Sequence, residues 1–347
     1  MALSKAQQTL INRVRSAGTS ALGVYLDDEI CAYLVAVIAR DLNLHETLTF
    51  PSDLPDFFSS SLLTSLRLED VDFHSAFEHL IQLKEDADTY FYCLANLHKA
   101  RLKYERILQA QAFSTIDQVG PRSLLQYGAL SPKALAGLLF WRKWLFDIDN
   151  RAGQETGYLF EPIIAYAIGG VPVSASKSPV RRKDNPQKGR QVDCILDRRA
   201  YEIKIRVTIA ASGQGRWREE LSFPEDCQAS GYTPVLLVLD ATSNPKLREL
   251  SNAFHNASGE VYTGEDAWSH LTVKAGATMS RFLELYVHTP IQALLEAAPD
   301  DLPEMTLQMH NRNIIITVDG EALHIQRDMP ETLSTEPDEM PGDVDEE

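Results

Sequence analysis

A short apolar run at residues 234–239 constrains the fold of this chain more than any other feature. The run, Pro-Val-Leu-Leu-Val-Leu, is almost wholly apolar. A strand of this composition is buried on both faces, as in a sheet that helices cover on each side. The sequence therefore predicts an α/β fold with a central β-sheet flanked by helices.

The sequence pattern changes near residue 150. Up to that point apolar side chains recur at helical spacing, and beyond it short β-type runs are interleaved with helical stretches. Pro162 and Pro290 are expected to kink or break their helices, and Asp319-Gly320 is typical of a tight hairpin turn. Helices are expected over 4–15, 28–39, 68–111, from 131 onward, 155–168, 213–232, 244–256 and 281–297. Strands are expected over 171–175, 191–196, 201–209, 234–239, 314–318 and 321–327, with a hairpin turn at 197–200.

We expect the chain to divide into three parts. A large helical N-terminal region covers residues 1–150, an α/β core with a C-terminal hairpin covers 151–328, and a tail covers 329–347. The tail holds eight acids from Glu331 onward and no Lys or Arg, so we expect it to be disordered. It accounts for about half of the net charge of −16.

Two carboxylates and one ammonium group are predicted to meet on neighbouring β-type runs. Asp193 lies in the run 191–196, and Glu202 and Lys204 lie in the run 201–209. Residues i and i+2 of a strand share a face, so Glu202 and Lys204 project together, and hairpin pairing brings Asp193 to the same face. Mg²⁺ takes one or two carboxylates plus water, and a lysine beside it can orient or deprotonate an attacking water. The pattern suits metal-assisted hydrolysis of a phosphate ester.

Positive charge gathers around these residues in an otherwise acidic chain. Between residues 177 and 206 there are ten Lys or Arg and four acids, a local balance of +6. Non-specific affinity for DNA comes mainly from such side chains at phosphates, and Arg and Gln also suit base edges. We expect DNA contacts from two segments that flank the paired runs: Arg181, Arg182, Lys183, Lys188, Arg190, Gln214, Arg216 and Arg218. The alternative for the first segment is an ordinary solvated charged loop, and for the second it is a flexible loop that caps a helix beginning at about residue 219.

The stretches Val192-Asp193 and Glu202-Ile203-Lys204 resemble the motif of the PD-(D/E)xK nuclease superfamily, which includes type II restriction endonucleases. The chain departs from that motif at Val192, where proline often stands. The superfamily order of helix, strand, acid-bearing hairpin, helix and strand is similar to residues 154–240. The resemblance implies a restriction-endonuclease-like core with a mixed central β-sheet.

The resemblance also implies a further acid on the helix that precedes the first strand. Glu161 is favoured for this position and Glu155 is the alternative. In the superfamily, the residues that match Asp193 and Glu202 bind the metal, and the lysine that matches Lys204 positions or activates water.

A narrower resemblance, to the ApaLI-type restriction endonucleases, rests on residues 188–193 and 201–216. It implies cleavage of double-stranded DNA at the palindrome GTGCAC with Mg²⁺. A palindrome is met most simply by a two-fold symmetric homodimer, for which the helical region is expected to supply the contact or a clamp around DNA. The rivals are a repair or junction-cleaving nuclease of the same fold and a non-catalytic DNA-binding protein.

The cysteines and apolar runs bear on the compartment. The four cysteines are far apart and form no CxxC pair, so we expect buried free thiols in a reducing bacterial cytoplasm. No run reaches the roughly 18 apolar residues that span a bilayer, and no signal peptide is visible. We therefore expect no membrane partner.

Overall fold

The structure is a computed structural model. It describes residues 3–18, 22–44, 47–51, 53–59, 63–206, 214–240, 242–298 and 300–327, with the backbone alone at 214–216. The α-helices are α1 (Lys5–Arg15), α2 (Asp28–Asp41), α3 (Phe73–Leu83), α4 (Ala87–Ala110), α5 (Ile116–Val119), α6 (Pro132–Ala167), α7 (Gln214–Ala229), α8 (Pro245–Asn256), α9 (Glu265–Leu283) and α10 (Thr289–Glu296). The strands are β1 (Val171–Val173), β2 (Val192–Leu196), β3 (Arg199–Lys204), β4 (Thr233–Val238), β5 (Glu260–Thr263), β6 (Met305–His310), β7 (Asn313–Val318) and β8 (Glu321–Gln326).

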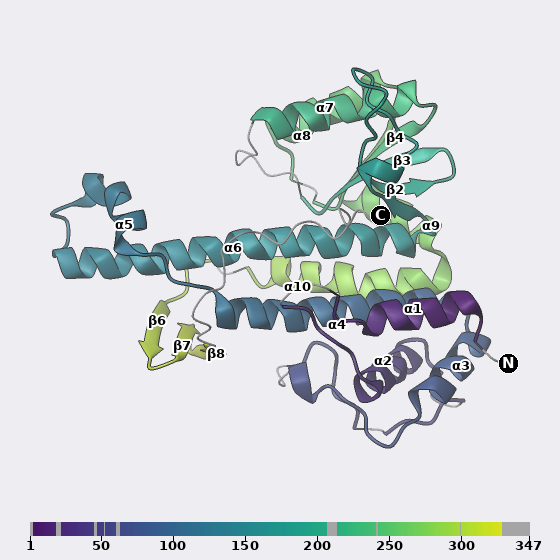
Figure 1. Ribbon diagram of the computed structural model, residues 1–347, viewed down its shortest axis with the longest axis horizontal. Coiled ribbons are helices and arrows are strands. Elements are labelled where there is room, and N and C mark those ends of the chain that lie inside the picture. Colours follow the sequence, from purple (N-terminus) through teal and green to yellow (C-terminus); the bar gives the residue numbers. More distant parts are fainter. Residues whose placement is uncertain are drawn as a thin grey trace.

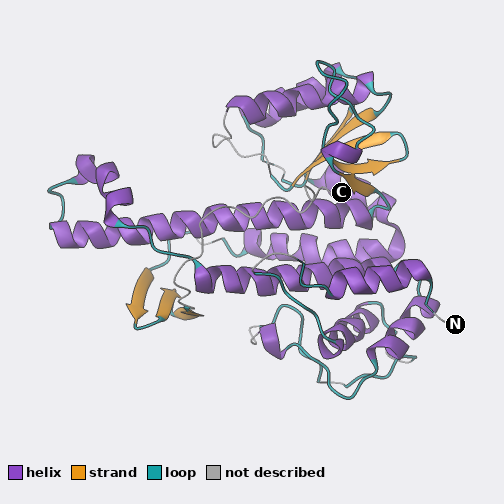
Figure 2. Cartoon of the chain, viewed as in Figure 1, coloured by secondary structure: helices purple, strands orange, loops and turns teal. Residues whose placement is uncertain are grey.

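The central sheet has five strands in the order β1-β2-β3-β4-β5. Figure 2 shows the strands in orange and the helices around them in purple. The β1–β2 and β2–β3 pairs are antiparallel, and the β3–β4 and β4–β5 pairs are parallel. The β2–β3 hairpin turns at Asp197 and Arg198, since Leu196 already pairs with Arg199. The prediction of a mixed sheet is confirmed, although the turn is two residues shorter than expected.

Helices cover both faces of this sheet, as the apolar run on β4 predicts. On one face, Phe223 of α7 joins Leu236 of β4 in a buried cluster that α8 completes. On the other face, Ile164 of α6 and Leu271 of α9 lie in one core with Leu237. Because neighbouring residues of a strand point to opposite faces, β4 is buried from both sides, and the α/β class is confirmed.

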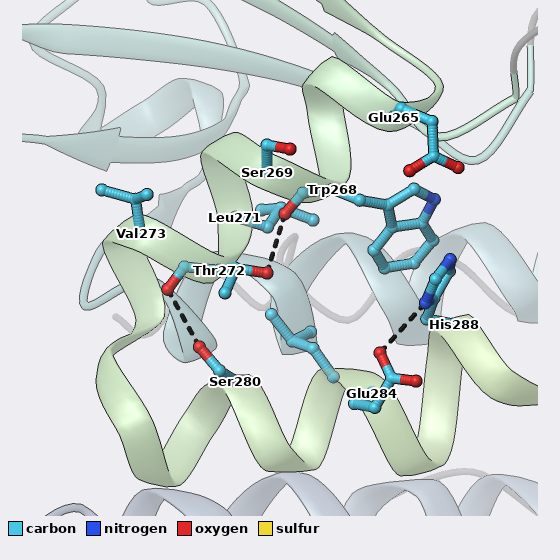
Figure 3. A pocket seen from close by; sticks show the side chains of 10 residues that line it. Glu265, Trp268, Ser269, Leu271, Thr272, Val273, Ser280, Glu284 and His288 are labelled. Carbon is cyan, nitrogen blue, oxygen red and sulfur yellow. Dashed lines mark hydrogen bonds and ion pairs between the residues drawn. The ribbon is translucent and has the colours of Figure 1, made fainter.

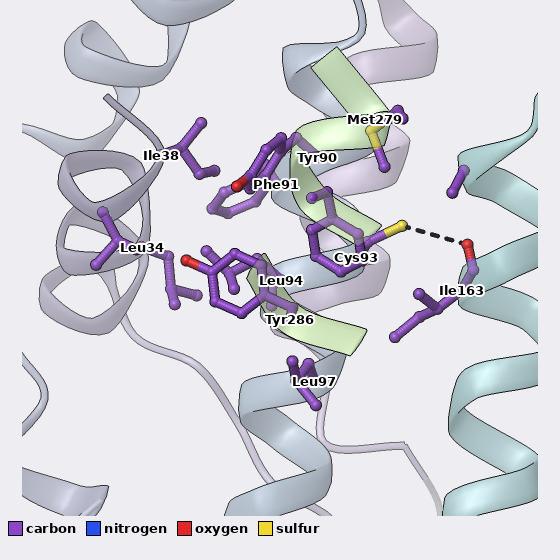
Figure 4. Packing of buried hydrophobic residues seen from close by; sticks show 14 of the residues in the cluster. Leu34, Ile38, Tyr90, Phe91, Cys93, Leu94, Leu97, Ile163, Met279 and Tyr286 are labelled. Carbon is purple, nitrogen blue, oxygen red and sulfur yellow. Dashed lines mark hydrogen bonds between the residues drawn. The ribbon is translucent and has the colours of Figure 1, made fainter. Parts of the chain in front are cut away.

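The helical region shares its core with the sheet. Figure 4 shows Leu34 of α2, Phe91 of α4, Ile163 of α6 and Met279 of α9 packed together. The same buried cluster reaches Ile203 of β3. One continuous core therefore joins the N-terminal helices to the sheet, and the division into parts at residue 150 stays a prediction.

The α6 helix runs unbroken through the point where the sequence predicts two separate helices (Figure 1). It begins at Pro132, where the Ser131 hydroxyl caps the N–H of Ala134. Pro162 lies inside the helix, although an interior proline removes one hydrogen bond and costs roughly 3 kcal/mol. Ile163 and Ile164 bury their side chains next to it, so packing offsets the lost bond. The expectation of a separate helix over 155–168 was wrong.

Two other predicted helices also differ from the expectation. The pattern over 68–111 forms α3 and α4, which are separated where Asp86 adopts a left-handed backbone. Near residue 290, a π-helical turn, Glu284–His288, joins α9 to α10, so the chain stays helical up to Pro290 at the start of α10. The strands β5 and β6 were not predicted.

The predicted C-terminal hairpin forms β7 and β8 within a separate three-stranded sheet. Ile314 and Ile325 of this sheet pack on Trp144 of α6, so the hairpin lies against the long helix instead of extending the central sheet (Figure 1). The acidic tail lies outside the described residues. Within the part of the chain that is described, no helix has the length and apolar composition to cross a membrane.

Candidate active site

The side chains of Asp193, Glu202 and Lys204 lie together where β2 begins and β3 ends. Lys204 Nζ donates a hydrogen bond to Glu202 Oε1 at 2.6 Å. The Asp193 carboxylate accepts a hydrogen bond from the backbone N–H of Ile203 at 2.8 Å, just beyond the last β2–β3 pair. The two acids and the ammonium group therefore converge, as the spacing in the sequence predicts.

An irregularity in β2 helps to aim the Asp193 side chain. Val171 of β1 pairs with Ile195 of β2, and Val173 of β1 pairs with Val192 of β2. Two steps along β1 therefore correspond to three steps along β2, so β2 contains one extra residue. The extra residue forms a bulge, a feature that re-aims side chains next to active sites. The cysteine after Asp193 lies in the larger core, so alternation turns Asp193 toward the face that α7 covers.

The two candidate acids on α6 have different surroundings. Glu155 forms ion pairs with Lys103 at 3.1 Å and Arg151 at 3.2 Å. Glu161 instead lies close enough to Asp193 to raise the pKa of that carboxyl. The electrostatic effect on Asp193 favours Glu161 over Glu155 as the acid that accompanies the hairpin residues.

The electrostatics of the site favour a bound cation. Burial raises the pKa of Asp193 well above its usual range, and the negative charges of Glu202 and Glu161 raise it further. Burial disfavours the charged form of Lys204, but the carboxylates of Glu202, Asp193 and Glu220 outweigh this effect and raise the lysine pKa. Several acids around one lysine leave excess negative charge, and their oxygens are the ligands that Mg²⁺ prefers.

The number of acids suits a cation that keeps much of its water. Among the described residues, no group of three or more His, Cys, Asp or Glu is arranged to hold a metal ion. The predicted ligand set has two members, Asp193 and Glu202, and Mg²⁺ is usually bound through one or two carboxylates plus water. The residues present therefore fit this ion.

An Asp193→Asn substitution is expected to stabilise the metal-free protein by on the order of 1 kcal/mol, the scale of many stabilising substitutions. The amide carries no charge, and its oxygen can still accept the Ile203 N–H. Because the pKa of Asp193 is raised in the folded state, this carboxyl favours folding at low pH and loses that contribution as pH rises through the folded pKa. In EDTA, the Tm advantage of the variant should therefore grow from acidic to neutral pH.

The control for this experiment is Asp184→Asn, at an exposed acid of the neighbouring loop. It should change Tm little across the same pH range. A lower Tm for Asp193→Asn at neutral pH in EDTA would contradict the electrostatic account.

Acids of other elements neutralise much of the predicted basic cluster. At least five of the ten basic side chains between residues 177 and 206 form ion pairs: Arg182 with Glu219, Lys183 with Glu225, Arg190 with Asp226, Arg199 with Glu260, and Lys204 with Glu202. Three of these acids lie on α7, outside the stretch of sequence that shows the basic excess. The local balance of +6 therefore overstates the positive charge that this surface presents.

Arg190 has a structural environment. Its side chain is 8% exposed and pairs with Asp226, which is 5% exposed, at 3.0 Å. It also donates to the hydroxyl of Ser222 and to the backbone carbonyl of Glu219. The same Asp226 accepts the backbone N–H of Lys183 at 2.7 Å. This arrangement fastens the loop 180–190 to α7, and it does not support a DNA contact for Arg190.

The other basic side chains that the structure describes lie at the surface. Arg181, Arg182 and Lys188 line a hollow of about 360 Å³ on the loop 180–190. Lys183 and Arg218 are exposed. The predicted contacts from Gln214 and Arg216 lie outside the described side chains.

The α9 helix is kinked at Gly276, whose backbone is non-helical. A larger cavity, of about 400 Å³, lies between the two parts of α9 on either side of this kink and the π-helical turn (Figure 3). Trp268 stacks near His288, whose Nδ1 lies 3.0 Å from Glu284 Oε2. Glu265 adds a second acid to the lining, and no Lys or Arg lines the cavity. Its chemistry does not suit a phosphodiester, so cavity size does not identify the active site of this chain.

Sequence reasoning missed Glu220, whose Oε1 lies 3.8 Å from Lys204 Nζ. The available signal was the helical spacing of Glu220, Phe223 and Cys227, which puts all three on the buried face of α7. An acid on the buried face of a helix requires a charged or hydrogen-bonding partner, because burying an unpaired charge is costly.

The mixed sheet, its helical cover and the acid-bearing hairpin define a restriction-endonuclease-like α/β protein. A family model described as ApaLI-like restriction endonuclease matches residues 59–288, and the chain belongs to that family. The type II restriction enzyme ApaLI of Acetobacter pasteurianus is 54% identical over 218 residues, which cover 61% of this chain and 58% of that enzyme. The match thus spans little more than half of the relative's length. No solved structure matches the chain.

Proposed function

We propose that this chain is a type II restriction endonuclease that hydrolyses phosphodiester bonds of double-stranded DNA with Mg²⁺. The observation that carries the proposal is the meeting of Asp193, Glu202 and Lys204 on adjacent strands, with Glu161 nearby. Membership of the ApaLI-like family supports the same reaction.

Each of these residues has a proposed role. Asp193 and Glu202 hold the cation, and Glu161 assists from α6. Mg²⁺, when bound, supplies polarisation of the phosphate and lowers the pKa of water. The Lys204 ammonium orients the attacking water and offsets the negative charge that develops on the phosphate oxygens. The bulge in β2 and the hydrogen bond from Ile203 keep the Asp193 carboxylate in place.

The DNA-binding surface is proposed to include Arg181, Lys188 and Arg218. Arg182 and Lys183 each form an ion pair with an acid of α7. Because partly exposed ion pairs contribute little stability, each side chain is proposed to leave its acid and bind a DNA phosphate instead. For Gln214 and Arg216 the proposal rests on the sequence alone.

The proposed target is the palindrome GTGCAC, which the ApaLI-type resemblance of the sequence implies. Incubation with Mg²⁺ of plasmids that carry no, one or two copies of this sequence tests it, followed by sequencing of the DNA ends. Discrete fragments that increase with copy number are expected. Cleavage confined to branched DNA would favour a repair or junction nuclease, and DNA that is bound but never cut would favour a non-catalytic protein.

We also propose that the chain acts as a homodimer, with the helical region 1–150 supplying the contact or a clamp around DNA. A two-fold dimer presents equivalent active sites to the two strands of a palindrome. Analytical ultracentrifugation should give the mass of two chains, with or without a target duplex. A one-chain mass in both conditions would overturn the dimer.

A further inference from the structure

We infer that Glu220 of α7 is a positioning residue that holds the Lys204 ammonium at the active face while Glu202 binds the cation. The inference rests on the proposed function, because it concerns how the lysine of that site is kept in place. Glu220 acts through Lys204 and is given no contact with DNA or metal.

The geometry places Lys204 between two carboxylates from different elements. Lys204 Nζ lies 2.6 Å from Glu202 Oε1 on its own strand and 3.8 Å from Glu220 Oε1 on the covering helix. The three side chains are 19%, 14% and 18% exposed, in the order Lys204, Glu202, Glu220. A charge that is largely removed from water requires such partners.

Two consecutive glutamates of α7 have different partners. The side chain of Glu219 is 54% exposed and pairs with Arg182 on the loop 180–190. Glu220 points inward with Phe223, and its recorded ion pair is with Lys204. The helix thus brings one acid to the surface loop and the other to the active face.

The need for a second acid follows from the two tasks of Glu202. In the structure, Glu202 accepts the hydrogen bond of Lys204. A cation held by Glu202 and Asp193 competes for the same carboxylate oxygens and repels the ammonium group. Glu220 is the remaining carboxylate beside Lys204, and it keeps the lysine near the site when that competition occurs.

Glu220 comes from a different element than the proposed ligands. Asp193 and Glu202 lie on β2 and β3, whereas Glu220 lies on α7, where it pairs with Lys204. Replacing Glu220 should therefore leave metal affinity nearly unchanged. Calorimetric titration of Mn²⁺ should give dissociation constants within about threefold for native protein and Glu220→Gln, whereas Asp193→Asn should lose the binding.

Cleavage kinetics provide the first readout. Glu220→Gln should lower kcat by about 10- to 100-fold, the usual cost of losing a partner that orients a group at a metal site, with KM for DNA changed less than about threefold. Glu219→Gln is the matched control, at a neighbouring but exposed position, and its kcat should stay within about twofold of native. An unchanged kcat in Glu220→Gln would overturn the inference.

Thermal melting in EDTA provides a readout that needs no activity. Glu220→Gln should lower Tm in the native background by about 2–4 °C, a typical effect of a weakened interaction in a protein of this size. In the Lys204→Met background, Glu220→Gln should leave Tm unchanged or raise it, because the acid that it removes no longer has the lysine as a partner.

The two backgrounds decide between positioning and a general structural role. Equal losses of Tm with lysine and with methionine at position 204 would show that Glu220 acts independently of Lys204, and would overturn the inference. If the native protein cuts no DNA at all, the proposed function fails, yet the melting cycle still reports whether Glu220 and Lys204 are coupled.

Discussion

A Lys204→Met variant is expected to lose DNA cleavage by about 10²- to 10⁴-fold in kcat, the range for removing a group that stabilises charge or transfers a proton in the transition state. Methionine keeps much of the length of the side chain but cannot donate to Glu202 or neutralise a phosphate. Single-turnover cleavage of a plasmid with Mg²⁺ measures the loss, and filter binding in EDTA reports whether DNA is still held.

Lys183→Met is the matched control for this experiment. Lys183 belongs to the same basic stretch, but its side chain is 64% exposed and pairs with Glu225 on the surface. Its loss should weaken DNA binding modestly and leave kcat unchanged at saturating DNA. Near-native cleavage by Lys204→Met would remove this lysine from the reaction, whatever the control shows.

Replacing Arg190 by Met is expected to destabilise the protein by about 3–5 kcal/mol, the usual cost of removing one partner of a buried ion pair. The substitution leaves the Asp226 carboxylate buried without its cation and removes donors to Ser222 and Glu219. Urea unfolding followed by circular dichroism measures the change. Arg182→Met, which breaks an exposed pair with Glu219, should cost no more than about 1 kcal/mol.

A second substitution tests the electrostatic reason for that loss. Asp226→Asn in the Arg190→Met background should restore part of the stability, because the amide carries no charge and its oxygen still accepts the Lys183 N–H. No recovery would mean that packing against Phe223, not charge, accounts for the cost. If Arg190→Met instead binds DNA weakly and unfolds like the native protein, Arg190 is part of the DNA-binding surface.

Local sequence rules were sufficient to predict much of the central hairpin. The spacing of Asp193, Glu202 and Lys204 depends only on two strands, a short turn and the alternation of side chains. The composition of β4 likewise indicated a sheet covered on both faces. These features are encoded within a few neighbouring residues, and for this reason they could be predicted without the fold.

Features that depend on distant elements could not be predicted in this way. Glu220 and Asp226 look like ordinary helix acids until α7 is placed against the hairpin and the loop 180–190. The net charge of a stretch of sequence likewise omits the acids that folding brings beside it. The continuity of α6 through Pro162 was missed because core packing decided it, whereas the sequence rules weigh only the lost hydrogen bond.

The unbroken α6 also limits how this protein can change in length. An inner turn of the helix packs with the C-terminal sheet through Trp144, and its C-terminal part carries Glu161 beside the hairpin of the candidate active site. Each inserted residue turns one end relative to the other by about 100°, so a single insertion between them would swing Glu161 away from Asp193. Insertions of about seven residues, close to two full turns, restore the angular phase. The helix therefore fixes the angular relation between the C-terminal sheet and the candidate active site.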